Sequence, residues 1–145
     1  LGLKDPAFLR FHTDRPAAHA ALVEALEQPS LYDDALFQLA QHGLPVPEEV
    51  LNRDVTQAYA PSEGVEAAWL MVYRDTRKYW ELYQLAEKLV DLDDALITWR
   101  HKHVLTVERI IGGKKGTGGT PGVAYLASTL SKRAFPELWT LRTAL

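Results

Sequence analysis

The chain has 145 residues, of which 47% are hydrophobic and 24% are charged, with a formal net charge of −3. This composition is typical of a globular domain with a hydrophobic core, and it offers no excess of basic charge for nucleic acid or a membrane surface. There is no cysteine, which excludes disulfides, thiolate metal sites, iron–sulfur clusters and a cysteine nucleophile. Any metal must therefore be held by histidine or carboxylate side chains.

The sequence given shows neither a bilayer-spanning pattern nor the pattern of a signal peptide. No apolar run reaches the ~20 residues that span a bilayer. The first residues, Leu1–Asp5, lack the charged leader and apolar core of a signal peptide, and there is no initiator methionine. We interpret this as an internal start and expect the chain to be a fragment of a longer protein.

Turn and capping signals divide the first part of the chain into short helices. Ser30 followed by Asp33 has the spacing of a capping box, which predicts the start of a helix. Gly43, with two prolines after it, predicts the end of that helix. These and similar signals predict short helices over residues 6–11, 16–26 and 30–43, and another from residue 47.

Two longer amphipathic patterns follow. Apolar and aromatic residues recur at spacings of four and three from Ser62 to Val90, which predicts one long helix. Three acids between Asp91 and Asp94 interrupt this stripe, and we expect a second long helix to start there and to end at Gly112. The apolar face of this second helix consists of Leu92, Leu96, Trp99, His103, Val107 and Ile110.

The rest of the chain is also helical in pattern, with an amphipathic stretch over residues 123–131 and a short helix from Pro136. No stretch keeps the strict alternation of a half-buried strand. We therefore predict a single all-α domain over residues 1–145, a helical bundle with two long antiparallel helices and several short helices.

His103 is the first candidate for a functional residue. It lies on the apolar stripe between Trp99 and Val107, whereas His101 points about 200° away on helical geometry. Two imidazoles at i and i+2 on a helix do not reach one ion, so the pair does not predict a zinc site. An imidazole in an apolar crevice is suited to haem ligation, but from position alone an ordinary core or interface histidine is the more frequent case.

A glycine-rich segment is the second candidate, because residues 112–122 hold six of the nine glycines. It lacks the Gly-Lys-Ser/Thr triplet of a Walker A loop, and Pro121 stands where a dinucleotide fingerprint starting at Gly116 needs glycine. Two interpretations remain open. The segment is either an anion-binding loop, with two lysines and the hydroxyls of Thr117 and Thr120, or a linker whose glycines end a helix.

Other clusters have plainer explanations. Asp91, Asp93 and Asp94 fit the acidic first turn of a helix better than a metal site. No Gly-x-Ser-x-Gly signature of Ser/His/Asp catalysis occurs. A set of aromatic residues fits core and interface packing better than a platform for stacking bases. This set comprises Trp69, Tyr73, Tyr79, Trp80 and Tyr83.

Four stretches of the sequence resemble the tryptophan 2,3-dioxygenase family in its bacterial form. Trp99–Gly112 resembles the haem-ligand helix of that family, and Lys115–Gly122 resembles its glycine loop. Pro29–Asp33 and residues 135–143 also look like family sequence. The resemblance runs in order over essentially the whole chain, and a Thr-Val-Glu-Arg helix followed by Gly-Thr-Gly-Gly is a specific combination.

This resemblance implies an oxidoreductase that opens the indole ring of L-tryptophan to N-formylkynurenine, with O2 as oxidant and haem b as cofactor. The reaction is the first step of tryptophan catabolism by the kynurenine pathway. His103 matches the axial ligand of the haem iron. Thr117 matches the loop threonine that holds the ammonium and carboxylate end of tryptophan. The resemblance further implies a cytoplasmic homotetramer and no catalytic residue within this chain.

The distal pocket of the family is not encoded here. Its distal histidine, its aromatic residues around the indole and its carboxylate-pairing arginine have no counterpart, although Leu1–Lys4 resembles the tail of the helix that carries the arginine. We therefore expect the C-terminal, proximal-haem part of an enzyme, inactive without its N-terminal segment. Two alternatives stay open: a non-catalytic haem-binding or helical interaction module, and a relative that oxidises another indole substrate.

Overall fold

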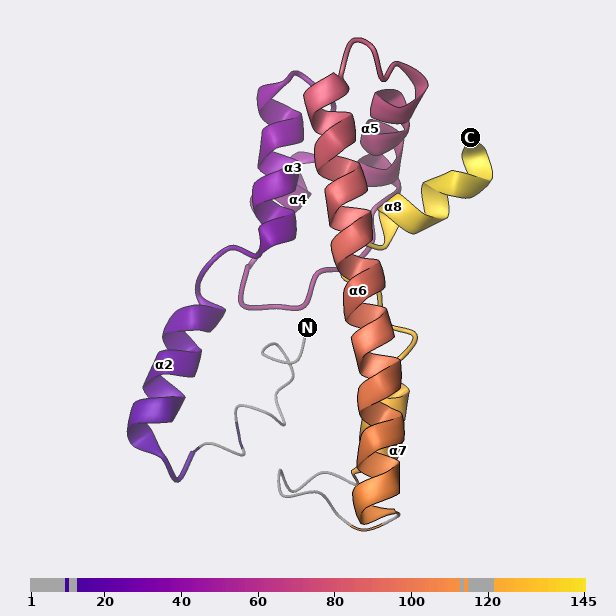
Figure 1. Ribbon diagram of the computed structural model, residues 1–145. Helices are drawn as coiled ribbons and strands as arrows, with labels where there is room; N and C mark the ends of the chain where they lie inside the picture. Colours follow the sequence, from indigo (N-terminus) through magenta and orange to yellow (C-terminus); the bar gives the residue numbers. More distant parts are fainter. Residues whose placement is uncertain (1–9, 11–12, 113, 115–121) are drawn as a thin grey trace. The chain divides into compact units, whose positions relative to one another are not determined.

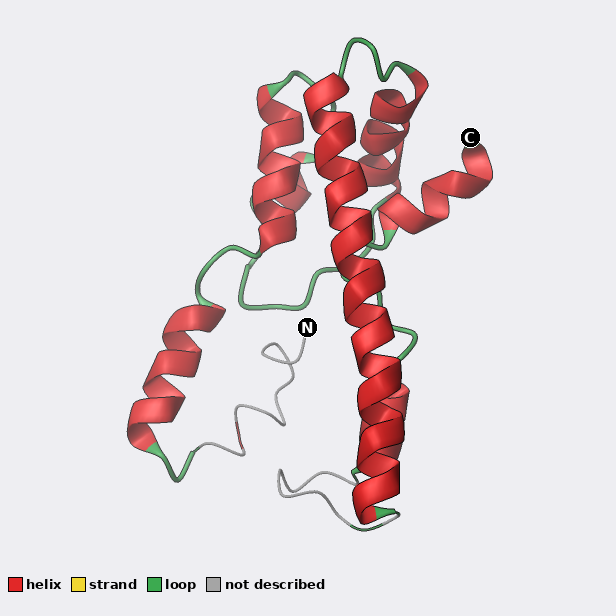
Figure 2. Cartoon of the chain, viewed as in Figure 1, coloured by secondary structure: helices red, strands yellow, loops and turns green. Residues whose placement is uncertain are grey.

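A computed structural model of the chain describes residue 10, residues 13–112, residue 114 and residues 122–145. All regular secondary structure in these ranges is helical, as Figures 1 and 2 show, which confirms the all-α class. The chain divides into two compact units. The first unit comprises residues 1–90 and 135–145, and the second unit comprises residues 91–134.

The helices of the described residues follow the expected order. The short helices predicted from capping and turn signals are present, except that the one expected at 6–11 lies almost entirely outside the described residues. In chain order the elements are α2 (Pro16–Leu26), α3 (Leu31–Gln41), α4 (Glu48–Leu51), α5 (Glu63–Arg74), α6 (Trp80–Ile111), α7 (Val123–Ser128), α8 (Glu137–Thr140) and the 3₁₀ helix η1 (Leu141–Ala144).

Local sequence determines both ends of α3. At its start, the backbone N–H of Asp33 donates to the Ser30 hydroxyl at 3.2 Å, and the backbone N–H of Ser30 donates to the Asp33 carboxylate at 2.7 Å. This confirms the capping box. At its end, Gly43 has a φ of 78°, and the N–H of Leu44 donates to the carbonyl of Leu39 at 3.1 Å. This is a Schellman motif, which glycine permits because it adopts left-handed backbone without strain.

The break between the longer helices was predicted at the wrong place. The helix expected from Ser62 to Val90 is interrupted at residues 75–79, between α5 and α6. Asp75 leaves the helical region, with a φ of −134°, and its carboxylate accepts the backbone N–H of Lys78 at 3.1 Å. A short aspartate side chain that bonds the backbone nearby competes with the helix in this way.

The acids at residues 91–94 were predicted to begin a helix. They lie instead inside α6, which has 32 residues. Asp91 and Asp94 are exposed, so they disturb no packing. Asp93 is buried, and its partners are described below. The structure therefore has one long helix preceded by the 12-residue α5, rather than two long helices that meet at the acids.

The hydrophobic core of the first unit lies where α3, α5, the start of α6 and α8 meet (Figure 1). Trp69 at its centre is fully buried, as its place in the aromatic set predicted. Around it pack Tyr32, Ala35, Leu36, Leu39, Val65, Ala68, Val72, Leu82, Ala86, Leu89, Phe135, Leu138 and Leu141. In the part of the chain described, none of the helices combines the length and apolar character needed to cross a bilayer.

Candidate functional site

His103 lies on a face of α6, in the second unit, that exposes apolar side chains. Spacings of four, three and four residues place Leu92, Leu96, Trp99 and His103 on one face of the helix. We call these four residues the apolar face. Leu92, Leu96 and Trp99 are 42%, 36% and 59% exposed, and His103 is half-buried. An exposed apolar strip of this kind is typical of a surface that a ligand or another segment covers.

The imidazole of His103 stacks on the indole of Trp99, one helical turn earlier. The ring centroids lie 4.9 Å apart, and the ring planes differ by 8°. Among the residues described, neither ring nitrogen of His103 has a hydrogen-bond partner. In the part of the chain that the structure describes, the stack on Trp99 therefore supports this ring.

His101 takes no part in this arrangement. It is exposed, and its position two residues before His103 puts it on another side of α6. Within the described ranges, no group of three or more histidine, aspartate or glutamate side chains is placed to hold a metal ion. A zinc site, which the spacing of His101 and His103 does not predict, also gains no support from the geometry of the described residues.

Thr117 and the middle of the glycine segment lie outside the described residues, but both flanks are described. Gly112 follows α6 directly with a φ of 56°, and Gly122 precedes α7 with a φ of 59°. Positive φ values favour glycine, and the one at Gly112 confirms that this residue ends the helix. The role of Thr117 as a substrate-binding residue remains a prediction.

Two side chains of α6 hold the segment that follows α7 in the second unit. The backbone N–H of Ala134 donates to both carboxylate oxygens of buried Asp93, at 3.1 Å each. The guanidinium of Arg100 donates to the carbonyl of Lys132 at 2.6 Å. The sequence did not predict either contact, since each side chain pairs with backbone more than 30 positions away.

A buried carboxylate organises the first unit. Glu137, in the first turn of α8, is 2% exposed. It accepts hydrogen bonds from the hydroxyls of Tyr32 and Tyr59, at 2.8 and 2.6 Å, and from the backbone N–H of Ser62 at 2.8 Å. The indole N–H of Trp69 in turn donates to the Tyr32 hydroxyl at 3.1 Å. We call these five residues the Glu137 cluster.

The Glu137 cluster is a satisfied structural network. Burial, and then the neighbouring Glu137 carboxylate, raise the pKa of both the Tyr32 and the Tyr59 phenols well above the ordinary value. Both phenols therefore stay protonated and donate to the carboxylate. With its donors in place, this buried charge leaves no reactive group open to a substrate, and its role is to fix α8 against α3 and α5.

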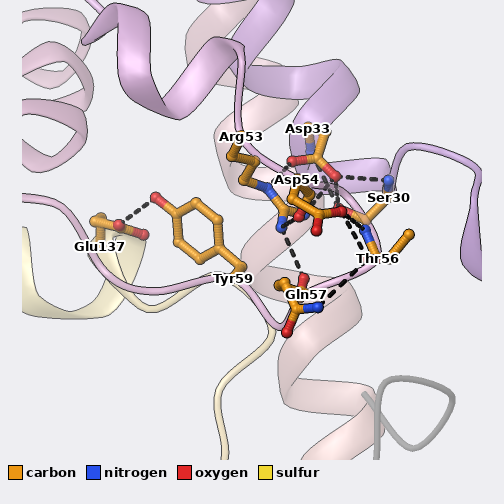
Figure 3. Close-up of polar contacts among 8 residues, drawn as sticks. All are labelled: Ser30, Asp33, Arg53, Asp54, Thr56, Gln57, Tyr59 and Glu137. Atoms are coloured by element: carbon orange, nitrogen blue, oxygen red, sulfur yellow. Dashed lines mark hydrogen bonds and ion pairs between the residues drawn. The ribbon is translucent and has the colours of Figure 1, made fainter.

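Arg53 forms a second polar centre in the first unit, drawn with Tyr59 and Glu137 in Figure 3. Its guanidinium donates to both carboxylate oxygens of Asp33, at 2.6 and 2.7 Å, and to the carbonyl of Gln57 at 2.8 Å. Burial alone would raise the pKa of Asp33, but the hydrogen bonds from Arg53 and Ser30 outweigh it and hold this pKa below its ordinary value. The pair ties the start of α3 to the loop after α4.

Comparison with known proteins identifies the family. The family model for tryptophan 2,3-dioxygenase matches residues 68–145, just over half of the chain. The chain belongs to the tryptophan 2,3-dioxygenase family. The matched range contains α6 with His103 and the glycine segment with Thr117, so the resemblance noted from the sequence is confirmed.

Curated tryptophan 2,3-dioxygenases match over the whole chain. The protein from Caulobacter vibrioides (strain ATCC 19089 / CIP 103742 / CB 15) is 73% identical over 145 residues, and the chain covers 55% of its length. Those from Bacillus thuringiensis (strain Al Hakam) and Polaromonas naphthalenivorans (strain CJ2) are 55% and 54% identical over the same 145 residues. The chain spans about half the length of these relatives, 52% and 51% for the latter two.

Proposed function

We propose that this chain forms the proximal-haem part of a dioxygenase that converts L-tryptophan and O2 to N-formylkynurenine, the first step of the kynurenine pathway. The protein would act as a cytoplasmic homotetramer with haem b as cofactor. The observation that carries the proposal is the His103 imidazole. It lies on the apolar face of α6, without a hydrogen-bond partner among the described residues, in a segment that matches tryptophan 2,3-dioxygenase.

The side chains on this face of α6 are of the chemical types that bind a haem. A neutral imidazole nitrogen is a usual axial ligand of haem iron. In the described part of the chain, no group of three or more histidine, aspartate or glutamate side chains could hold a metal ion, whereas a porphyrin would bring further ligands of its own to an iron at His103. The exposed side chains of Leu92, Leu96 and Trp99 suit the apolar surface of such a macrocycle.

In such an enzyme the cofactor supplies the chemistry, and the protein binds and orients the reactants and excludes water. A bound haem would supply the activation of O2. His103 would hold the cofactor, and Leu92, Leu96 and Trp99 of the apolar face would exclude water from it. Thr117, with the backbone amides of a glycine-rich segment and the nearby lysines, would bind the ammonium and carboxylate end of tryptophan.

The direct test is turnover by the complete protein with isotopically labelled dioxygen. We expect tryptophan-dependent consumption of O2 and a product that carries both labelled oxygen atoms. A product with one labelled atom would instead support a relative that performs another oxidation. A haem-loaded protein that consumes no O2 with tryptophan or other indoles would support the non-catalytic module.

Thr117→Ala tests the substrate-binding role of that residue. Loss of one hydrogen bond to a charged group weakens binding by about 1.5–3 kcal/mol, so we expect the KM for tryptophan to rise roughly 10- to 150-fold. The haem absorption should be unchanged, because Thr117 is not assigned to the cofactor. An unchanged KM and kcat would remove Thr117 from the site. Thr129→Ala is a suitable control, since its hydroxyl donates to the nearby Leu126 carbonyl at 2.7 Å and is not assigned to the substrate.

A further inference from the structure

We propose that Trp99 is a positioning residue for His103, and that its indole fixes the plane of the imidazole assigned to the haem iron. The inference rests on the proposed function. Its basis is the parallel stack of the two rings, with centroids 4.9 Å apart and planes 8° from parallel. Residues four apart on a helix lie one above the other, so the backbone of α6 itself brings the rings together.

The orientation of an imidazole needs such a restraint. The torsion about the bond that carries the ring is broad, so rotation there changes the direction in which each nitrogen points. In metal sites a hydrogen bond to the second ring nitrogen usually removes this freedom. No such bond to His103 exists among the described residues. The flat contact with Trp99 is the restraint that the described structure offers.

The exposure of Trp99 separates this role from core packing. Trp69, a core residue, is fully buried and its indole N–H bonds the Tyr32 hydroxyl. Trp99 is 59% exposed, so its indole contributes little buried apolar surface to the described structure. Trp80 on the same helix is similarly exposed, at 54%, but its ring contacts the ring of Tyr83, with an angle of 34° between the two planes. Trp80 is therefore a matched control without an imidazole.

The test compares Trp99→Leu and Trp99→Phe with Trp80→Leu in the complete haem-loaded protein. The first readout is the rate at which haem transfers to excess apomyoglobin. The second is the iron–histidine stretching band of the ferrous protein in resonance Raman spectra. If the leucine variant does not fold, Trp99→Met replaces it, because methionine has a volume similar to that of leucine and also lacks a ring.

Loss of the ring should speed haem loss roughly two- to tenfold, the factor that corresponds to the usual energy of an aromatic stack. It should also shift or broaden the iron–histidine band, which a merely structural role would not do. Trp99→Phe should restore most of both properties, and Trp80→Leu should match the wild type.

Two results would overturn the inference while leaving the proposed function intact. One is a non-aromatic variant at Trp99 with wild-type haem loss and a wild-type band. The other is a phenylalanine variant as defective as the leucine variant, because flat stacking would then not be the cause. Normal haem absorption in His103→Ala would overturn the ligand assignment and this inference together.

Discussion

The phenol of Tyr32 in α3 donates a 2.8 Å hydrogen bond to the buried carboxylate of Glu137 in α8, 105 positions later in the chain. Through this bond, and those from Tyr59 and Ser62, residues 135–145 belong to the same compact unit as the residues before Val90. The apolar residues on either side of Glu137, Phe135 and Leu138, are buried in the same core.

Replacing Glu137 tests whether the Glu137 cluster stabilises this unit. Glu137→Gln keeps the size of the side chain but removes one of the two acceptor oxygens and places an N–H group against a donor. A buried donor left without an acceptor costs about 1–3 kcal/mol, and we expect a loss of this size in the apparent free energy of unfolding. Urea titration of the complete protein measures it. The exposed Glu81→Gln in α6 is the control, and equal stability of both variants would contradict the assigned role.

The raised pKa of Tyr32 predicts a loss of stability in alkali. Burial first, and then the Glu137 carboxylate, raise this pKa above the unfolded value of about 10. The folded state therefore favours the protonated phenol, so its contribution is complete below pH ~10 and falls as the pH rises further. The expected slope is about 1.4 kcal/mol per pH unit for this one group. Unfolding measured between pH 9 and 11 should show a shallower slope in Tyr32→Phe, and an identical slope would refute this linkage.

The Arg53–Asp33 pair predicts a matching effect in acid. The pKa of Asp33 is lowered on folding, so its contribution is present above the unfolded pKa of about 3.9 and is lost as the pH falls below it. Arg53→Gln removes the paired donors and should cost about 1–2 kcal/mol at neutral pH. It should also weaken the dependence of stability on pH below 4. The exposed Arg77→Gln should leave both properties unchanged.

A close approach between α5 and Pro47, the residue before α4, predicts the effect of one methyl group. Gly64, in the first turn of α5, lies so near the ring of Pro47 that a Cβ atom at residue 64 would overlap it. Alanine normally favours a helix over glycine by about 1 kcal/mol, but overpacking against a ring costs about 1–3 kcal/mol. We expect Gly64→Ala to destabilise the protein on balance. Because Pro47→Ala removes the overlapping atoms, the double variant should be more stable than the sum of the single effects predicts.

Local signals in the sequence were sufficient to predict several elements. Ser30, Asp33 and Gly43 define both ends of α3 through contacts within a few residues. The apolar face of α6 also follows from spacing alone. The stack of Trp99 on His103 is a further consequence of that spacing, although it was not predicted.

Other features depend on contacts that spacing does not reveal. The apolar pattern continues in phase across the turn at residues 75–79, so it concealed the break between α5 and α6. The acids at residues 91–94 resembled the first turn of a helix. The hydrogen bond to Asp93 from the backbone N–H of Ala134, 41 positions away, cannot be seen in the local sequence. Glu137, four residues before η1, gave no sign of burial because its donors come from two distant segments, at Tyr32 and at residues 59–62.

The central claim is that His103 holds the haem iron, and the absorption spectrum of His103→Ala in the complete protein tests it most directly. The control is His101→Ala, which changes an exposed imidazole two residues away on another side of α6. We predict that His103→Ala purifies without a Soret band, while His101→Ala keeps the wild-type band. A His103→Ala variant with a wild-type Soret band would contradict the claim.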